Sequence, residues 1–358
     1  MPVVDADAHV DETEETWQYI DEPLKRYTPI TITQQMGSDA GAQPKGYNRF
    51  WFSDGRFLVR RVRDDVRTRT TLETRELLDV PARMRHLDEL GIDLQVCYPT
   101  SFLMRWNPSD QVEHALRKSY NRWMGSKWAQ SDNRMRWVAL LPMGDIDEAI
   151  RELHIVKENG ACGIMQKGIE WGYRSAADPY FFPLYQEAAD LNIPICFHTG
   201  TSDPALSDAQ ALNLSFHNMM APVIDAFLSL YTAGVPTLFP KLRVGFIEAM
   251  ASWLPLALAE LRAREERSSW LFPELGVVDD LVKESRFYVA CQTVEDLPYL
   301  IRTCGEDNLV AGTDYTHADQ SAEIETLSII RRMGDENIIT KEQARKILED
   351  NPKAFYGL

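Results

Sequence analysis

The sequence predicts a single (β/α)₈ barrel, and three observations carry this prediction. Short apolar runs rich in β-branched residues recur eight times along the 358 residues. Most of these runs are followed by a longer stretch with helical periodicity, which is the pattern of parallel βαβ units. The length suits one barrel with insertions, because such barrels take roughly 250 residues or more. A doubly wound open sheet is the alternative that the same pattern allows.

The expected strands are short and almost wholly apolar, since parallel strands are covered on both faces. They lie at residues 3–5, 94–98, 137–141, 163–165, 195–198, 243–247, 287–290 and 309–311. Apolar positions at helical spacing predict helices at 80–90, 112–130, 146–158, 182–191, 253–264, 294–303 and 322–333. Residues 341–351 predict a closing helix, followed by a short terminal segment. The sequence shows no internal repeat or linker, so we expect one domain over 1–358.

An insertion at residues 11–78 follows the first strand and far exceeds the ~2–6 residues of an ordinary βα loop. Asp54-Gly55 lies between apolar flanks in it and predicts a β-hairpin. The insertion is rich in aromatic side chains such as Trp51. We expect either a lid over the barrel mouth, with Trp51 touching substrate, or a docking surface for another subunit. A second long segment, 199–215, is expected to line the same mouth.

The composition narrows the classes of partner. A formal net charge of −16 argues against nucleic acid and anionic membranes, because a phosphate backbone needs a basic footprint. We see neither a run of ~20 apolar residues nor a signal-peptide pattern, so a soluble cytoplasmic chain is expected. Five cysteines without a CxxC motif predict buried free thiols in a reducing compartment.

Side chains that bind metals close several of the expected strands. The first strand runs into Asp7 and His9, the fifth ends at His198, the sixth at Glu248 and the eighth at Asp314. Barrel enzymes place their chemistry at these strand ends, and the i, i+2 spacing puts Asp7 and His9 on one face. Each residue alone could be a cap or a satisfied polar group. Jointly they predict a divalent metal site, because buried carboxylates and imidazoles need a counter-charge.

Weaker candidates follow the same strand ends. Glu12, His217 and His317 could bind a second metal or the substrate, although Glu12 could equally be a solvated charge and His217 a helix cap. Gln166 and Lys167 follow the fourth strand and could contact the substrate.

The motifs around these residues resemble the amidohydrolase superfamily, in its branch related to aminocarboxymuconate-semialdehyde decarboxylase. The resemblance covers nearly the whole chain and rests on DAHVDE, RMRHLDELGIDLQVCYPT, YNRWMGSKW, FHTG, FPKLRVGFIEAMASWLP, AGTDYTHAD and NPKAFYGL, in that order. It implies a distorted (β/α)₈ barrel with Asp7, His9, His198 and Asp314 as ligands of a divalent metal. It also implies a dimer or larger homo-oligomer.

The sequence departs from that branch in three places. Many of its decarboxylases have His-x-His or Glu-x-His on the first strand, where this chain has Asp7-Ala8-His9. They place a catalytic histidine after the sixth strand, where this chain has Glu248. Thr316 stands where relatives often have proline. Because this histidine is absent, the reaction of those decarboxylases does not transfer directly to this chain.

Three functions remain open from the sequence. The first is metal-assisted hydrolysis or non-oxidative decarboxylation of a small aromatic or carboxylate-bearing substrate, with zinc as the expected metal. In it Asp314 moves the proton, Glu248 is a second acid–base group or ligand, and His217 is a further catalytic candidate. The second is a dinuclear iron or manganese–iron oxygenase, in which Glu248 binds the second ion. The third is a non-catalytic, metal-bearing subunit of a hetero-oligomer.

Overall fold

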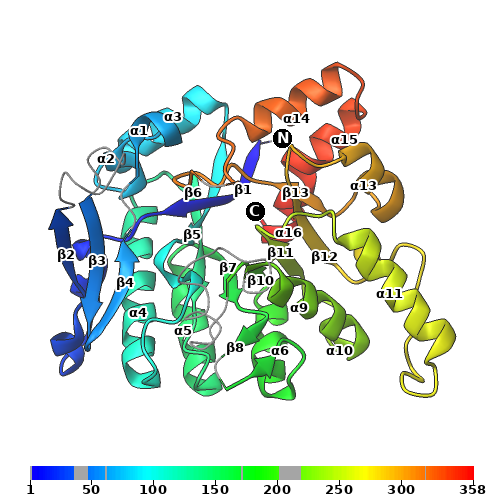
Figure 1. Ribbon diagram of the computed structural model, residues 1–358, viewed down its shortest axis with the longest axis horizontal. Coiled ribbons are helices and arrows are strands. Elements are labelled where there is room, and N and C mark those ends of the chain that lie inside the picture. Colours follow the sequence, from blue (N-terminus) through cyan, green and yellow to red (C-terminus); the bar gives the residue numbers. More distant parts are fainter. Residues whose placement is uncertain (1, 36–46, 61–62, 171, 201–218, 319) are drawn as a thin grey trace.

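The computed structural model describes residues 2–35, 47–60, 63–170, 172–200, 219–318 and 320–358. Eight parallel strands follow one another in chain order around a nearly closed barrel (Figure 1). They are β1 (Val4–Val10), β5 (Leu94–Pro99), β6 (Met135–Leu140), β7 (Ala161–Gln166), β10 (Ile195–His198), β11 (Val244–Ile247), β12 (Phe287–Cys291) and β13 (Leu309–Ala311). This order confirms the (β/α)₈ prediction, and the doubly wound alternative is wrong.

Helices follow most of the strands and surround the barrel (Figure 1). The longer ones are α3 (Val80–Leu90), α4 (Asp110–Trp128), α5 (Ile146–Glu158), α6 (Phe182–Asp190), α9 (Ala221–Thr232), α11 (Leu254–Arg267), α13 (Leu297–Cys304) and α14 (Thr326–Asp335). Their boundaries have local causes. In α3, the Asp79 carboxylate accepts from the amide of Ala82 at the start, and Gly91 ends the helix at φ 69°.

Shorter elements fill the connections. The helical turns are η1 (Glu14–Tyr19), η2 (Leu24–Tyr27), α1 (Asp65–Thr68), α2 (Leu72–Arg75), η3 (Ser101–Leu103), η4 (Pro179–Phe181), α10 (Val235–Leu238) and α12 (Leu281–Glu284). A two-stranded ribbon of β8 (Ile169–Glu170) and β9 (Arg174–Ser175) follows β7. The chain closes through α15 (Lys341–Arg345), η5 (Lys346–Asp350) and α16 (Asn351–Tyr356).

The first strand is longer than its sequence predicts. The prediction ended it at residue 5, whereas β1 continues to Val10 and pairs His9 with Tyr98 of β5. The pairing register shifts between Asp5 and Ala8. Polar residues inside the strand hid its continuation, because a parallel strand is normally recognised by an unbroken apolar run. Asp7 and His9 therefore belong to the barrel wall itself.

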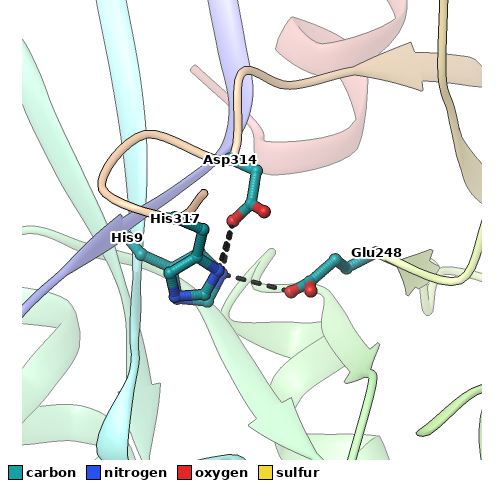
Figure 2. Close-up of side chains that lie close together, drawn as sticks. All are labelled: His9, Glu248, Asp314 and His317. Carbon is teal, nitrogen blue, oxygen red and sulfur yellow. Dashed lines mark ion pairs between the residues drawn. The ribbon is translucent and has the colours of Figure 1, made fainter. Parts of the chain in front are cut away.

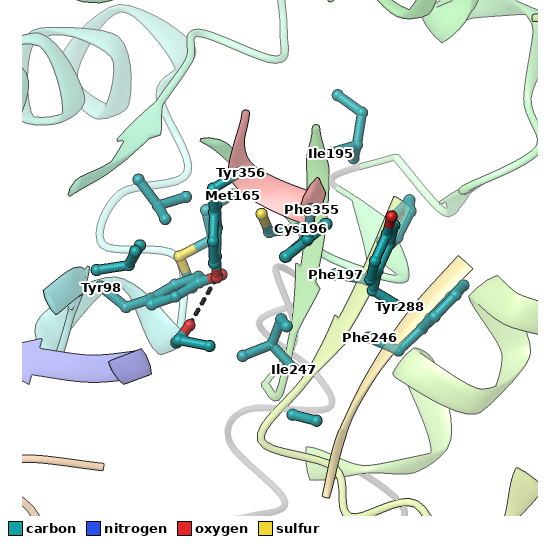
Figure 3. Packing of buried hydrophobic residues seen from close by; sticks show 14 of the residues in the cluster. Tyr98, Met165, Ile195, Cys196, Phe197, Phe246, Ile247, Tyr288, Phe355 and Tyr356 are labelled. Atoms are coloured by element: carbon teal, nitrogen blue, oxygen red, sulfur yellow. Dashed lines mark hydrogen bonds between the residues drawn. The ribbon is translucent and has the colours of Figure 1, made fainter. Parts of the chain in front are cut away.

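Barrel closure depends on the last helix. In Figure 3, Phe355 and Tyr356 of α16 lie among side chains of β10, β11 and β12. Phe355 stacks on Tyr288 with 4.9 Å between ring centroids. Tyr356 donates its hydroxyl to the carbonyl of Ala6 at 2.6 Å, and the same hydroxyl lies 2.7 Å from that of Tyr98. The carboxyl-terminal helix thus holds β1 against the remainder of the barrel core.

The insertion contains an antiparallel sheet of β2 (Ile30–Gln35), β3 (Tyr47–Ser53) and β4 (Arg56–Arg60), beside α4 at the left of Figure 1. The hairpin turn falls at Asp54-Gly55 as predicted, with positive φ at both residues. Trp51 is fully buried and meets Trp17 and Trp106 at 5.6 and 6.1 Å. The prediction that Trp51 touches substrate is therefore wrong, because the ring anchors the sheet.

Two further expectations concern the chain as a whole. Among the residues that the structure describes, every cysteine is unpaired; four are buried and Cys304 is partly exposed. Within the same part of the chain, none of the helices combines the length and the apolar character needed to cross a bilayer.

Candidate metal centre

The predicted ligands converge at the carboxyl ends of the strands. Ligand atoms of Asp7, His9 and His198 lie within 4.8 Å of one another. A second group of ligand atoms, also within 4.8 Å, combines His9 with Glu248, Asp314 and His317 (Figure 2). The two groups share His9. The structure therefore brings all five predicted metal ligands together and adds His317, the weaker candidate.

The spacing of these atoms suits a bound cation. His198 Nε2 lies 3.0 Å from Glu248 Oε2, and His9 Nε2 lies 3.3 Å from the same oxygen. His9 Nε2 also lies 3.5 Å from Asp314 Oδ1, and Asp7 Oδ1 lies 3.6 and 3.8 Å from the two imidazoles. Two ligands held ~2.1 Å from one ion at angles of about 90–110° lie about 3.0–3.4 Å apart. The closest of these pairs therefore need little contraction to bind one ion between them.

Burial supplies an independent test of fit. Apart from these contacts with one another, Asp7 Oδ1, His9 Nε2, His198 Nε2 and Glu248 Oε2 are buried and meet no hydrogen-bond partner among the described residues. Buried polar atoms left in this way are costly, and a divalent cation would satisfy all four. The residues present therefore fit a metal ion.

The two imidazoles are oriented by their other nitrogen. His9 Nδ1 lies 3.1 Å from the carbonyl oxygen of Pro99, and His198 Nδ1 lies 3.3 Å from that of Thr199. A carbonyl accepts from Nδ1–H, which leaves the lone pair on Nε2. Both Nε2 atoms point into the cluster, as metal-binding histidines require.

Charge coupling fixes the protonation of the cluster without a metal. Burial would raise the pKa of Glu248, but His198 and His9 hold it well below its usual range. Burial would lower the pKa of His198, but the carboxylates of Glu248 and Asp7 raise it to about 9. Glu248 is therefore ionised at neutral pH, and a proton on His198 takes the place that a cation would fill.

The two carboxylate residues that follow β11 and β13 have backbone angles that are rare for residues other than glycine. Glu248 has φ 55° and Asp314 has φ 51°, in the left-handed region that is sparsely populated by residues other than glycine. Thr316 has φ 89°, which the ring of proline forbids. A proline at this position would therefore need a different local backbone.

Glu295 holds the segment that carries Glu248. Its buried carboxylate accepts from the amides of Ala251 at 2.9 Å, Ser252 at 2.6 Å and Gln292 at 2.8 Å. These bonds join the loop after β11 to the loop after β12. No sequence pattern indicates this role, because a glutamate in a loop is normally interpreted as a solvated charge.

A chain of close polar contacts leads away from the cluster through Asp314. Its Oδ1 lies 2.7 Å from His317 Nδ1, and His317 Nε2 lies 3.2 Å from the hydroxyl of Thr100. The His317 ring stacks on His9 with 4.1 Å between centroids. Ser321, which the sequence analysis did not single out, donates to Asp314 Oδ2 at 2.8 Å. A small pocket beside the cluster is lined by Asp7, Glu248, Ala290, Cys291, Gln292, Gly312, Asp314 and Ser321.

The remaining candidates have different surroundings. Glu12 is neither a ligand nor a solvated charge: it is buried and accepts from the amides of Thr100 and Ser101 at 3.1 and 2.9 Å. Burial raises the pKa of Glu12 to about 7. Glu12 therefore braces the loop after β5, and the expectation of a solvated charge is wrong. His217 and residues 201–215 lie outside the described residues.

Gln166 and Lys167 lie at the end of β7, inside the barrel mouth. Gln166 Oε1 accepts from the hydroxyl of Tyr185 at 3.2 Å, and its Nε2 is buried without a hydrogen-bond partner among the described residues. Lys167 Nζ is buried and donates to the carbonyl of Thr199 at 2.9 Å. Burial lowers the pKa of Lys167 to about 7.

Fold and site together define a metal-dependent barrel enzyme. Comparison with known proteins agrees: the amidohydrolase family model matches residues 4–358, and the chain belongs to this family. It is a metal-dependent hydrolase or carboxy-lyase, which sets aside the non-catalytic interpretation.

The relatives include several decarboxylases. The chain is 25% identical over 289 residues to 2-amino-3-carboxymuconate-6-semialdehyde decarboxylase of Dictyostelium discoideum, covering 78% of this chain and 77% of that protein. An amidohydrolase from Mycobacterium avium subsp. paratuberculosis K-10 shares the fold with a TM-score of 0.77 and 19% identity, over 100% of this chain and 98% of that one.

A third relative carries a metal. Dihydroxybenzoic acid decarboxylase from Polaromonas sp. JS666, solved with manganese and 2-nitroresorcinol, has a TM-score of 0.60 and 19% identity, covering 77% of this chain and 85% of that one. These findings confirm the predicted superfamily and its decarboxylase-related branch.

Proposed function

We propose that the chain is a divalent-metal-dependent decarboxylase of a small aromatic carboxylate. The observation that carries the proposal is the convergence of buried ligand atoms from β1, β10, β11 and the loop after β13. The names of the relatives favour decarboxylation over hydrolysis, since one acts on a carboxymuconate semialdehyde and another on a dihydroxybenzoic acid. Asp7, His9, His198, Glu248 and Asp314 would hold the ion. Manganese, as in that relative, and zinc are the candidates.

The reaction requires one proton and releases one carbon dioxide. The bond between ring carbon and carboxylate breaks, and its electron pair stays on the ring carbon, which takes up the proton. When bound, the ion would neutralise charge on the substrate oxygens and orient them. Glu248 is held ionised by the neighbouring imidazoles and would serve as a ligand. The pair Asp314 and His317, linked at 2.7 Å and connected onward to Thr100, would deliver the proton.

Substrate contacts are proposed for Gln166 and Lys167. The amide nitrogen of Gln166 lacks a hydrogen-bond partner among the described residues, and so offers a donor. Lys167 Nζ is buried beside Thr199, the residue after the proposed ligand His198. Its pKa is lowered to about 7, so its ammonium form is partly populated at neutral pH and would attract a carboxylate. Replacing Lys167 with methionine should raise KM more than it lowers kcat, because the side chain binds the substrate before and during the reaction.

The test uses protein stripped of metal and reloaded separately with Zn²⁺, Mn²⁺ or Fe²⁺. Each form is incubated with a panel of ortho-hydroxylated benzoates, and released carbon dioxide and product are quantified. We expect metal-dependent release that falls roughly 100- to 10,000-fold in Asp314→Asn. Asp279→Asn, which removes an exposed carboxylate, is the control and should keep full activity. Cleavage of esters or amides without any carbon dioxide release would replace the proposal with hydrolysis.

The second group of ligand atoms supports one alternative. His9, Glu248, Asp314 and His317 could hold a second ion next to the first, as a dinuclear oxygenase would need. Two iron or manganese ions per chain, together with substrate-dependent oxygen uptake, would favour this alternative. One ion per chain and anaerobic turnover would favour the decarboxylase.

A further inference from the structure

Ser321 lies where the outer oxygens of two proposed metal ligands meet. Its hydroxyl donates to Asp314 Oδ2 at 2.8 Å and lies 3.3 Å from Glu248 Oε1. The other oxygen of each carboxylate faces His9, with Glu248 Oε2 at 3.3 Å and Asp314 Oδ1 at 3.5 Å from its Nε2 (Figure 2). Each carboxylate therefore turns one oxygen toward the proposed ion and the other toward Ser321.

The segment that carries Ser321 is anchored to the barrel. Just beyond it in the chain, the amide of Glu323 donates to the carbonyl of Thr313 at 3.2 Å. The next residue, Ile324, is buried in a small apolar cluster that includes Ala8 of β1. Because these contacts lie so close to Ser321 in the chain, they limit how far its hydroxyl can move from the two carboxylates.

The barrel strands do not by themselves orient these carboxylates. Glu248 and Asp314 lie after the last residues of β11 and β13, and both have positive φ. The torsion that turns a carboxylate about its last bond has broad minima, so backbone and rotamer leave open which oxygen faces the cluster. A hydrogen-bond donor on the outer oxygen settles this choice. Ser321 offers one hydroxyl to both outer oxygens.

The space around Ser321 is too small for the substrate. The cavity that Ser321 lines together with Glu248 and Asp314 has a volume of about 10 Å³. Such a volume holds about one water molecule and no aromatic ring. Ser321 therefore acts through the two carboxylates and does not contact the substrate.

We propose that Ser321 is a positioning residue that keeps Glu248 and Asp314 bound to the ion through one oxygen each. The inference rests on the proposed metal centre. By engaging the outer oxygens, the hydroxyl stops either carboxylate from binding the ion through both of its oxygens, and a coordination position stays open for water or substrate. A hydroxyl has one proton to donate, so the shorter distance makes Asp314 the carboxylate that depends on it most.

The test compares full-length wild type, Ser321→Ala and Ser321→Thr, each stripped of metal and loaded with an equimolar amount of Mn²⁺. Relaxation of water protons by the bound Mn²⁺ reports the exchanging water on the ion, and it needs no substrate. In Ser321→Ala we expect this relaxivity to fall at least about twofold and kcat for carbon dioxide release to fall about 10- to 100-fold, with the ion retained. Ser321→Thr keeps the hydroxyl and should restore both values.

The matched control is Ser328→Ala, which removes an exposed hydroxyl from α14 and should match wild type in relaxivity and kcat. Ser321→Cys provides a second variant in case Ser321→Ala fails to fold. Its thiol is a weak donor of similar size, and the same loss of relaxivity is expected.

Two outcomes would overturn the proposal. Folded Ser321→Ala with the relaxivity and kcat of wild type would show that the carboxylates are oriented without the hydroxyl. Loss of the ion from Ser321→Ala and Ser321→Thr alike would show that the residue only supports the loop. A wild-type chain that binds no divalent ion would overturn the metal centre itself, whereas normal relaxivity changes without carbon dioxide release would overturn only the proposed reaction.

Discussion

Replacing Glu248 with glutamine tests whether this carboxylate is a metal ligand. The change keeps the shape of the side chain and removes its charge. At the 3.0 Å that separates Glu248 Oε2 from His198 Nε2, one unit of opposite charge is worth about 5 kcal/mol at an effective dielectric constant near 20. If the easier desolvation of the amide offsets half of that attraction, the loss is still about 2–3 kcal/mol. Metal affinity should therefore fall roughly 100-fold.

The assay is competition for Mn²⁺ or Zn²⁺ between the stripped protein and a chromophoric chelator, with metal content verified by mass spectrometry. Glu336→Gln removes the same charge from an exposed position and serves as the control. An affinity for the metal within threefold of wild type in Glu248→Gln would refute the reasoning. Glu248 would then lie beside the metal centre without binding the ion.

Other perturbations follow from the same structure. Glu12 binds its proton up to about pH 7 when folded, against 4.5 as its ordinary pKa, so the unfolding free energy should fall as pH rises through this window. Urea titrations at pH 5, 6 and 7 should show a wild-type loss of up to ~3 kcal/mol that Glu12→Gln lacks; parallel pH profiles would contradict this. Glu295→Gln should weaken metal binding about 10- to 100-fold by releasing the loop that carries Glu248, measured by the same chelator competition, and unchanged affinity would remove that positioning role. Tyr356→Phe should lower the free energy of unfolding, measured with urea, by about 1–3 kcal/mol and leave kcat per bound metal constant. A fall in kcat would mean that the Tyr356–Ala6 hydrogen bond also affects catalysis.

The carboxyl ends of the strands are the part of the structure that the sequence predicts best. The predicted strands ending at His198 and at residue 311 match β10 and β13, because each is a short apolar run followed by a polar residue. In a barrel all such ends meet at one rim. Ligands on strands far apart in the chain can therefore be grouped from the sequence. The same argument makes His317, three residues beyond Asp314, a candidate ligand.

The role of a residue whose partner is distant in the sequence cannot be predicted from the ends of strands. Glu12 and Glu295 brace loops by accepting amides, and nothing near them in sequence identifies those donors. An aromatic-rich insertion predicts a lid with Trp51 touching substrate, yet the ring of Trp51 is buried against Trp17 and Trp106. Periodicity predicts which face a side chain occupies, but packing decides what that face meets.

The bond between Tyr356 and Ala6 has a consequence for biosynthesis. It joins positions 350 residues apart, and Phe355 occupies space that a side chain at Gly245 would fill. During synthesis β1 therefore lacks this contact until residue 356 has been made. Such distant closure slows folding, and a partly packed intermediate precedes it.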